Sequence, residues 1–135
     1  MVGVDAAPGC AEVVEAAFAH AHARGVGLVA VHCWASMAAP GGDLAGEYDR
    51  SAPELAAQQR LDDALSATKR HYPHVPVIGR LIRTGATGAA MVRESAEAGL
   101  VVVGSRGHAG AAGMMLSSVS QALLHHALCP VAVIR

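Results

Sequence analysis

The sequence predicts an α/β domain in three layers: a five-stranded parallel sheet with helices on both faces, doubly wound. Apolar runs of strand length alternate with segments whose apolar residues recur at helical spacing. The runs are nearly continuous, as in parallel strands that are buried on both faces. Hydrophobic residues make up 53% of the chain but aromatic residues only 3%, so small branched side chains must fill the core. We expect residues 1–135 to form one domain.

The first half of the chain is expected to hold two strands and two helices. Residues 1–4 form the first strand, and the helix that follows spans residues 10–24 and ends before a glycine. Residues 26–32 form the second strand, and residues 34–50 form a loop without periodicity. A helix then spans residues 51–72, opened by a capping box. Four residues are expected on its inner side: Leu55, Leu61, Leu65 and Thr68.

The second half is expected to continue the alternation of strand and helix. Strands are predicted at residues 77–82, 100–103 and 131–134, and helices at residues 87–98 and 118–127. This order favours one parallel sheet with right-handed crossovers. In such sheets, ligands bind at the carboxyl ends of the strands, where the strand order reverses.

Composition excludes several classes of function. The net charge is −1 and there is no basic cluster, so we expect no nucleic-acid partner. No apolar run approaches the ~20 residues of a membrane span, and we expect no membrane association. Three widely spaced cysteines make neither a disulfide framework nor a metal site and suggest the cytoplasm. Because the chain begins within a predicted strand, we expect it to be part of a longer protein.

The segment after the fourth predicted strand has the features of an anion site. The strand runs directly into Gly104, and hydroxyl residues stand at the start of the helix at 118–127. Glycine allows close backbone approach, and a helix N-terminus offers free N–H groups and a partial positive charge. The pattern therefore predicts a phosphate-binding site, and hence a nucleotide.

The spacing in this segment resembles the universal stress protein family. Members that bind ATP carry G-x2-G-x9-G followed by Ser or Thr, and this chain has Gly104, Gly107, Ser118 and Ser120 in place. Ser117 stands where the third glycine is usual. The resemblance covers essentially the whole chain, and the second domain of bacterial tandem-domain members is the most similar part.

The resemblance implies a regulatory module in the bacterial stress response that binds ATP or AMP, with or without Mg²⁺. Asp5 would lie near the ribose or metal, and the end of the second strand, around Val31, would meet the adenine through its backbone. The glycines would flank the phosphates, the helix N-terminus would bind them, and Arg106 could add charge. The residues expected at the ligand are Asp5, Ala6, Val31, Gly104, Arg106, Gly107, Ser117, Ser118, Val119 and Ser120.

Departures from the family pattern keep a second function open. If position 117 needs a positive φ, serine there is strained by about 1 kcal/mol. Ala6-Ala7 also stand where Gly-Ser is frequent. The alternative is a dimerisation or interaction module whose pocket is degenerate and binds no nucleotide. Enzymatic activity is expected to be absent, or at most a slow ATPase or autophosphorylation, because we identify no catalytic base.

The last predicted strand is the expected partner surface. An apolar strand at a sheet edge can pair with another copy. The expected partner is therefore a second copy, or a second similar domain, bound through the strand that ends the chain. The strand consists of Val131, Ala132, Val133 and Ile134.

Overall fold

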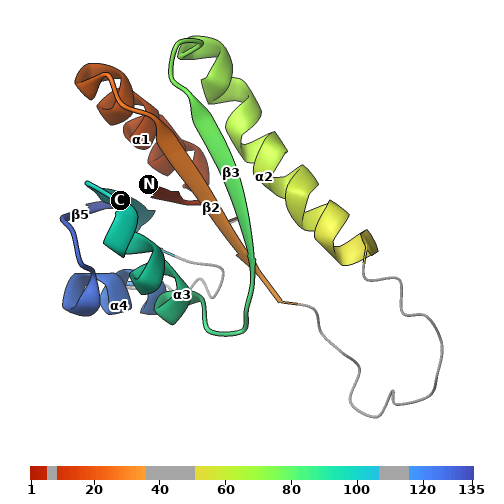
Figure 1. The fold of residues 1–135 in the computed structure, drawn as a ribbon, viewed down its shortest axis with the longest axis vertical. Helices are drawn as coiled ribbons and strands as arrows, with labels where there is room; N and C mark the ends of the chain where they lie inside the picture. The colour runs from red at the N-terminus through yellow and green to blue at the C-terminus, as the bar shows by residue number, and fades with distance from the viewer. Residues whose placement is uncertain (6–8, 36–50, 107–115) are drawn as a thin grey trace.

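The computed structural model describes residues 1–5, 9–35, 51–106 and 116–135, and it confirms the predicted architecture (Figure 1). One sheet of five parallel strands has the order β3-β2-β1-β4-β5. The strands are β1 (Val2–Gly3), β2 (Leu28–Trp34), β3 (Val77–Arg83), β4 (Val101–Gly104) and β5 (Val131–Ile134). The helices are α1 (Cys10–Arg24), α2 (Ser51–His71), α3 (Thr87–Glu94) and α4 (Ser118–His126).

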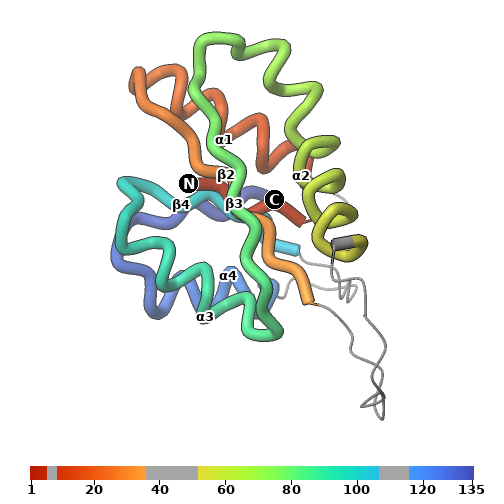
Figure 2. Tube along the Cα trace, turned by 45° about the vertical axis from the view of Figure 1, so that its right-hand side comes forward, coloured from red at the N-terminus to blue at the C-terminus, as the bar shows by residue number. Residues whose placement is uncertain are grey.

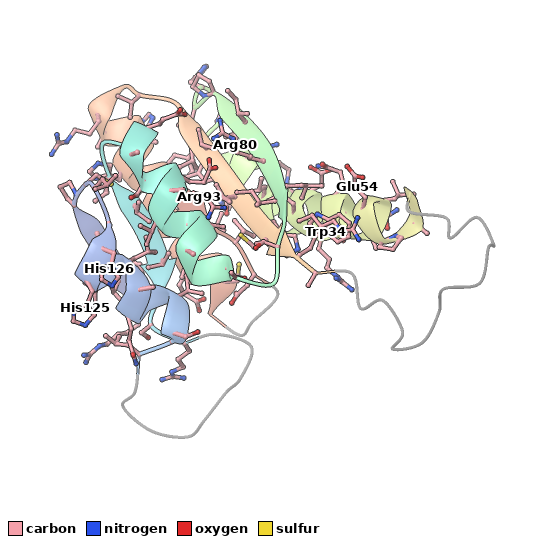
Figure 3. All side chains as sticks on the ribbon, turned by 60° about the horizontal axis from the view of Figure 1, so that its bottom comes forward. Trp34, Glu54, Arg80, Arg93, His125 and His126 are labelled. Carbon is pink, nitrogen blue, oxygen red and sulfur yellow. The ribbon has the colours of Figure 1, made fainter. Side chains whose placement is uncertain are left out.

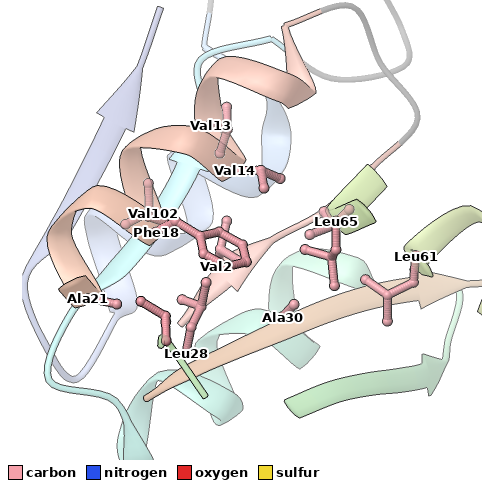
Figure 4. Packing of buried hydrophobic residues seen from close by; sticks show 13 residues of the cluster. Val2, Val13, Val14, Phe18, Ala21, Leu28, Ala30, Leu61, Leu65 and Val102 are labelled. Atoms are coloured by element: carbon pink, nitrogen blue, oxygen red, sulfur yellow. The ribbon is translucent and has the colours of Figure 1, made fainter. Parts of the chain in front are cut away.

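The sheet separates two hydrophobic clusters, which makes the domain three-layered (Figure 2). Alternate residues of each strand face opposite sides, so neighbours in β4 belong to different clusters. Val102 packs with α1 and α2, whereas Val101 and Val103 pack with α3 and α4. Figure 4 shows the first cluster, in which Phe18 of α1 is fully buried against the sheet.

Strand β2 is displaced from its predicted limits. It begins at Leu28 rather than Val26 and continues to Trp34, in register with β3 from Leu28↔Val77 to Trp34↔Arg83. The apolar run that we used to place the strand ends before the strand does. Backbone pairing with β3 continues past the polar residue His32 to Cys33 and Trp34, and a hydrophobicity pattern does not reveal this pairing.

The inner side of α2 was predicted correctly except for Leu55. Leu61, Leu65 and Thr68 are buried, but Leu55 is 59% exposed. The buried stripe begins instead at Ala57, four residues before Leu61. Leu55 lies two residues before Ala57, a rotation of about 200° at 100° per residue, and this places it on the outer side.

The helix predicted at 87–98 ends earlier than expected. The α-helix α3 stops at Glu94 and a 3₁₀ turn covers Ser95–Glu97. Ser95 is fully buried, and its hydroxyl donates to the Val92 carbonyl at 2.6 Å and accepts the Leu128 N–H at 3.0 Å. This serine joins the end of α3 to the segment before β5.

The predicted end of the first helix is confirmed. Gly25 ends α1 in a left-handed conformation with φ 63°. Cys10, Cys33 and Cys129 are free thiols, and each is half-buried. Of the helices in the described ranges, none is long and apolar enough to cross a membrane.

Candidate functional site

The site lies where the strand order reverses, between β1 and β4. These two strands are neighbours in the sheet, with Val2 in register with Val102. The chain leaves β1 toward α1 on one face and leaves β4 toward α4 on the other. Asp5 follows β1 and Gly104 ends β4, so both predicted residues lie at this carboxyl edge, as expected for a ligand site.

Asp5 brings negative charge to the start of α1. The residue before it, Val4, extends the pairing of β1 by donating its N–H to the Val31 carbonyl at 2.9 Å. Cys10, the first residue of α1, lies close to Asp5. Burial raises the pKa of the Cys10 thiol; a backbone hydrogen bond at Asp5 opposes this shift, and the Asp5 and Glu12 carboxylates add to it.

Gly104 is in a place where an added side chain would be tightly packed. A Cβ atom there would lie 3.3 Å from the Arg106 carbonyl oxygen and 3.3 Å from Cγ2 of Val13. The next residue, Ser105, donates its N–H to the Ile134 carbonyl of β5 at 2.7 Å. The chain therefore folds back over Gly104 directly after β4, and Arg106 is exposed beside this turn.

Ser117 caps helix α4 without backbone strain. Its φ of −60° and ψ of 154° are ordinary extended values, so the position does not need a positive φ. The Ser117 side chain accepts the Ser120 N–H at 3.1 Å, which is the standard contact of an N-cap serine. Its own N–H donates to the Ser105 carbonyl at 2.8 Å, and this bond brings α4 to the end of β4.

Ser120 fastens the first turn of α4 to the sheet. It is fully buried, and its hydroxyl donates to the Gly104 carbonyl at 2.6 Å. The Ser117 and Ser120 hydroxyl oxygens lie 2.8 Å apart. The first and last members of the predicted phosphate motif are thus directly bonded, although they are 16 residues apart in sequence.

The two residues between Ser117 and Ser120 differ in exposure. Ser118 is exposed, whereas Val119 is half-buried and packs against the second hydrophobic cluster. No acidic residue stands in the first turn of α4, so the positive end of the helix dipole is uncompensated by side chains of the turn. The arrangement can bind an anion with backbone N–H groups and without lysine.

Val31 is not at the end of its strand, contrary to the prediction. It is 1% exposed, its carbonyl accepts the Val4 N–H, and β2 continues for three residues beyond it to Trp34. The error has the same origin as the misplaced limits of β2. The backbone of the true strand end, at Trp34, lies next to β3.

Two side chains among the last three residues of β2 were not anticipated. His32 is buried, and its Nδ1 lies 2.8 Å from the Val4 carbonyl oxygen, so the imidazole bridges β2 and the end of β1. Trp34 lies at the end of β2 (Figure 3), with the Arg83 guanidinium 5.6 Å from its ring centroid. A histidine after an apolar run gives no distinctive sequence signal, whereas a single Trp bordering a loop could have drawn attention.

Two predicted residues, Ala6 and Gly107, lie outside the described residues. Within the described part of the chain, no group of three His, Cys, Asp or Glu side chains could hold a metal ion. His125 and His126 are exposed neighbours on α4, with ring centroids 6.1 Å apart (Figure 3).

Fold and site together define a doubly wound α/β domain whose switch point presents a carboxylate on one strand and a helix N-terminus after the next. The sequence matches the universal stress protein family over residues 1–135, and the chain belongs to that family. A universal stress protein of Mycobacterium tuberculosis is 41% identical over 135 residues, and one of Mycolicibacterium smegmatis is 34% identical over 137 residues. Both alignments cover 100% of this chain, which spans only 44% and 45% of those relatives.

A solved structure has the same fold with a nucleotide bound. It is the universal stress protein from Archaeoglobus fulgidus in complex with dAMP, with a TM-score of 0.68 and 25% sequence identity. The similarity covers 99% of this chain and 94% of that one.

Proposed function

We propose that this chain is a nucleotide-binding regulatory module that takes ATP or AMP, with or without Mg²⁺, and acts in the cytoplasm in a bacterial stress response. The observation that carries the proposal is the bond between the Ser120 hydroxyl and the Gly104 carbonyl. It holds the N-terminus of α4 at the switch point of the sheet, where Asp5 also lies. The dAMP complex of the Archaeoglobus relative supports an adenine nucleotide as the ligand.

The expected roles follow from the positions of the donors. The N–H groups of Ser118 and Val119, in the first turn of α4, bind the phosphate, and the exposed Ser118 hydroxyl adds a third donor. Arg106 contributes charge from the turn after β4. Asp5 lies on the ribose or metal side. We expect the site to hold a nucleotide with little or no turnover, since none of its residues in the described ranges is placed to activate water.

The first test is the nucleotide content of the purified protein, followed by calorimetric titration with ATP and AMP. Ser118→Pro tests the backbone donor directly, because proline is favoured at the first position of a helix and lacks the N–H. The extended ψ of Ser117, 154°, already suits a following proline. We expect Ser118→Pro to bind about tenfold more weakly than Ser118→Ala, which loses only the hydroxyl. Equal affinities of the two variants would contradict phosphate binding at this helix end.

A second candidate function is an interaction module without a nucleotide. The observation that favours it is the Ser117 cap, which already satisfies one N–H group at the helix end. In either case we propose that the module assembles through β5, an end strand of the sheet whose four residues are half-buried. The partner is a second copy or a second similar domain, consistent with relatives more than twice as long as this chain.

Val133 tests this assembly. Proline at a central position of β5 removes a backbone N–H and should prevent strand pairing across the edge. We expect Val133→Pro to lower the molar mass measured by light scattering. An unchanged mass would show that β5 is not the interface.

A further inference from the structure

The hydrogen bonds of the Ser117 and Ser120 hydroxyls, at the start of α4, determine which of the two donates to the other. Ser120 has one hydroxyl hydrogen, and it is donated to the Gly104 carbonyl. In the contact between the two hydroxyls, at 2.8 Å, Ser117 must therefore be the donor and Ser120 the acceptor. The Ser117 oxygen in turn accepts the Ser120 N–H at 3.1 Å. Both hydroxyl hydrogens are thus used inside the protein.

These hydrogen bonds decide which donors at the N-terminus of α4 remain available to a ligand. The N–H of Ser117 donates to Ser105, that of Ser120 to the Ser117 hydroxyl, and that of Gln121 to the Ser117 carbonyl. The first-turn donors left by this network, in the part of the chain that the structure describes, are the N–H groups of Ser118 and Val119 and the Ser118 hydroxyl. The third N–H of the turn is occupied by the protein itself.

We propose that Ser117 is a specificity-determining residue of the nucleotide site: its hydroxyl competes with the ligand's phosphate for the Ser120 N–H. This inference rests on the proposed function. A phosphate oxygen is charged and forms a stronger hydrogen bond than a neutral hydroxyl, but it must first displace a contact that is already formed. The Ser117 hydroxyl therefore lowers the affinity for the phosphate and leaves recognition of the nucleoside unchanged.

The distinction between phosphate and nucleoside gives the test. Calorimetry would measure the dissociation constants of AMP and adenosine, which differ only in the phosphate, for each variant. In Ser117→Gly the Ser120 N–H becomes available, and glycine is itself a tolerated N-cap residue. We expect this variant to bind AMP about tenfold more tightly than the wild type and adenosine equally well, because one charged hydrogen bond is gained.

Two control variants separate this effect from a general change in the fold. Ser117→Thr keeps a capping hydroxyl and should keep the wild-type ratio of AMP to adenosine affinity. Ser66→Ala removes a hydroxyl that donates to the Asp63 carbonyl on the exposed side of α2, and it should change neither affinity. An amide resonance of Ser120 that shifts when AMP binds to Ser117→Gly, but not when adenosine binds, would locate the gain at this N–H.

The outcomes distinguish the inference from the proposed function. If Ser117→Gly binds AMP no more tightly than the wild type, or gains equally for AMP and adenosine, the competition is wrong while nucleotide binding stands. If neither the wild type nor Ser117→Gly binds AMP, ATP or adenosine, the proposed function fails and the inference fails with it.

Discussion

The N-termini of α1 and α4 both lie at the carboxyl ends of the strands, on opposite faces of the sheet, but they differ in charge and in capping. Helix α1 begins after Gly9, whose φ is 92°, and within the described ranges no side chain caps it. Its first turn carries Glu12, and Asp5 lies nearby. Helix α4 begins after Ser117, which caps it, and its first turn holds no acidic residue.

The comparison separates two properties of a helix start, the local charge and the capping of its N–H groups. At α1, carboxylates compensate the positive end of the helix dipole, and this negative charge disfavours phosphate. At α4, the dipole is uncompensated but one N–H is occupied by a hydroxyl. Under the proposed function, the sign of the local charge therefore favours α4 for phosphate, and we expect the cap to set how strongly α4 binds it.

Ser120→Ala is expected to have the largest effect on stability. It leaves the Gly104 carbonyl without this donor, and Ser117 loses the acceptor of its own hydrogen. We expect a loss of about 1–3 kcal/mol in the free energy of unfolding, measured by urea denaturation. Ser66→Ala, an exposed helix hydroxyl, should cost less than about 0.5 kcal/mol. Similar losses in both variants would mean that the bond to Gly104 does not hold α4.

Gly9→Ala tests the open end of α1. A side chain at φ 92° is strained, and we expect a loss of about 1–2 kcal/mol in thermal or urea unfolding. Gly85→Ala is the matched control, because Gly85 lacks a positive φ and nothing lies within 4 Å of an added Cβ. If the two variants are equally stable, the left-handed start of α1 is not required by the fold.

Substitutions of Ser117 should have a smaller effect that depends on the replacement. Ser117→Ala removes the cap and should cost about 1 kcal/mol, whereas Ser117→Gly should cost only a few tenths. Unfolding without ligand measures both. A larger loss for glycine than for alanine would contradict the role of Ser117 as a cap.

The smallest expected effect is on the alkylation rate of the Cys10 thiol, which responds to the negative charge at the start of α1. Its pKa is raised above the ordinary 9.0, first by burial and then by the two carboxylates. Because the fold favours the protonated thiol, its contribution to the free energy of unfolding is fully present below about pH 9. This contribution is lost as the pH rises through the folded pKa. We expect slow alkylation of Cys10 at pH 8 and faster alkylation in Glu12→Gln. Mass spectrometry of the Cys10 peptide measures both rates. An unchanged rate would place Glu12 too far away to influence the thiol.

The fold could be predicted because its signals are local. The helix at Cys10–Arg24 and the strand at Val131–Ile134 have the predicted limits, since apolar spacing and a glycine stop define them. The end of β2 could not be predicted, because pairing with β3 continues past the apolar run. Leu55 was assigned to the wrong side because the buried stripe of α2 begins at an alanine, which gives a weak apolar signal.

The sequence could predict which residues stand at the candidate site, but not the hydrogen bonds between them. The spacing of Gly104, Ser118 and Ser120 placed the helix end after β4, as the structure has it. The sequence could suggest strain at Ser117, but it could not show that the hydroxyl caps its own helix. That choice depends on the position of Ser120, which the Gly104 carbonyl sets from another part of the chain.

Trp34 gives this domain a fluorescence signal with a single origin. It is the only tryptophan in the chain, and it stands at the end of β2 with the Arg83 guanidinium near its ring. The emission spectrum therefore samples one place, the carboxyl edge of the sheet. A titration that alters the surroundings of this edge can be followed in unlabelled protein, and the change in emission needs no assignment among several indoles.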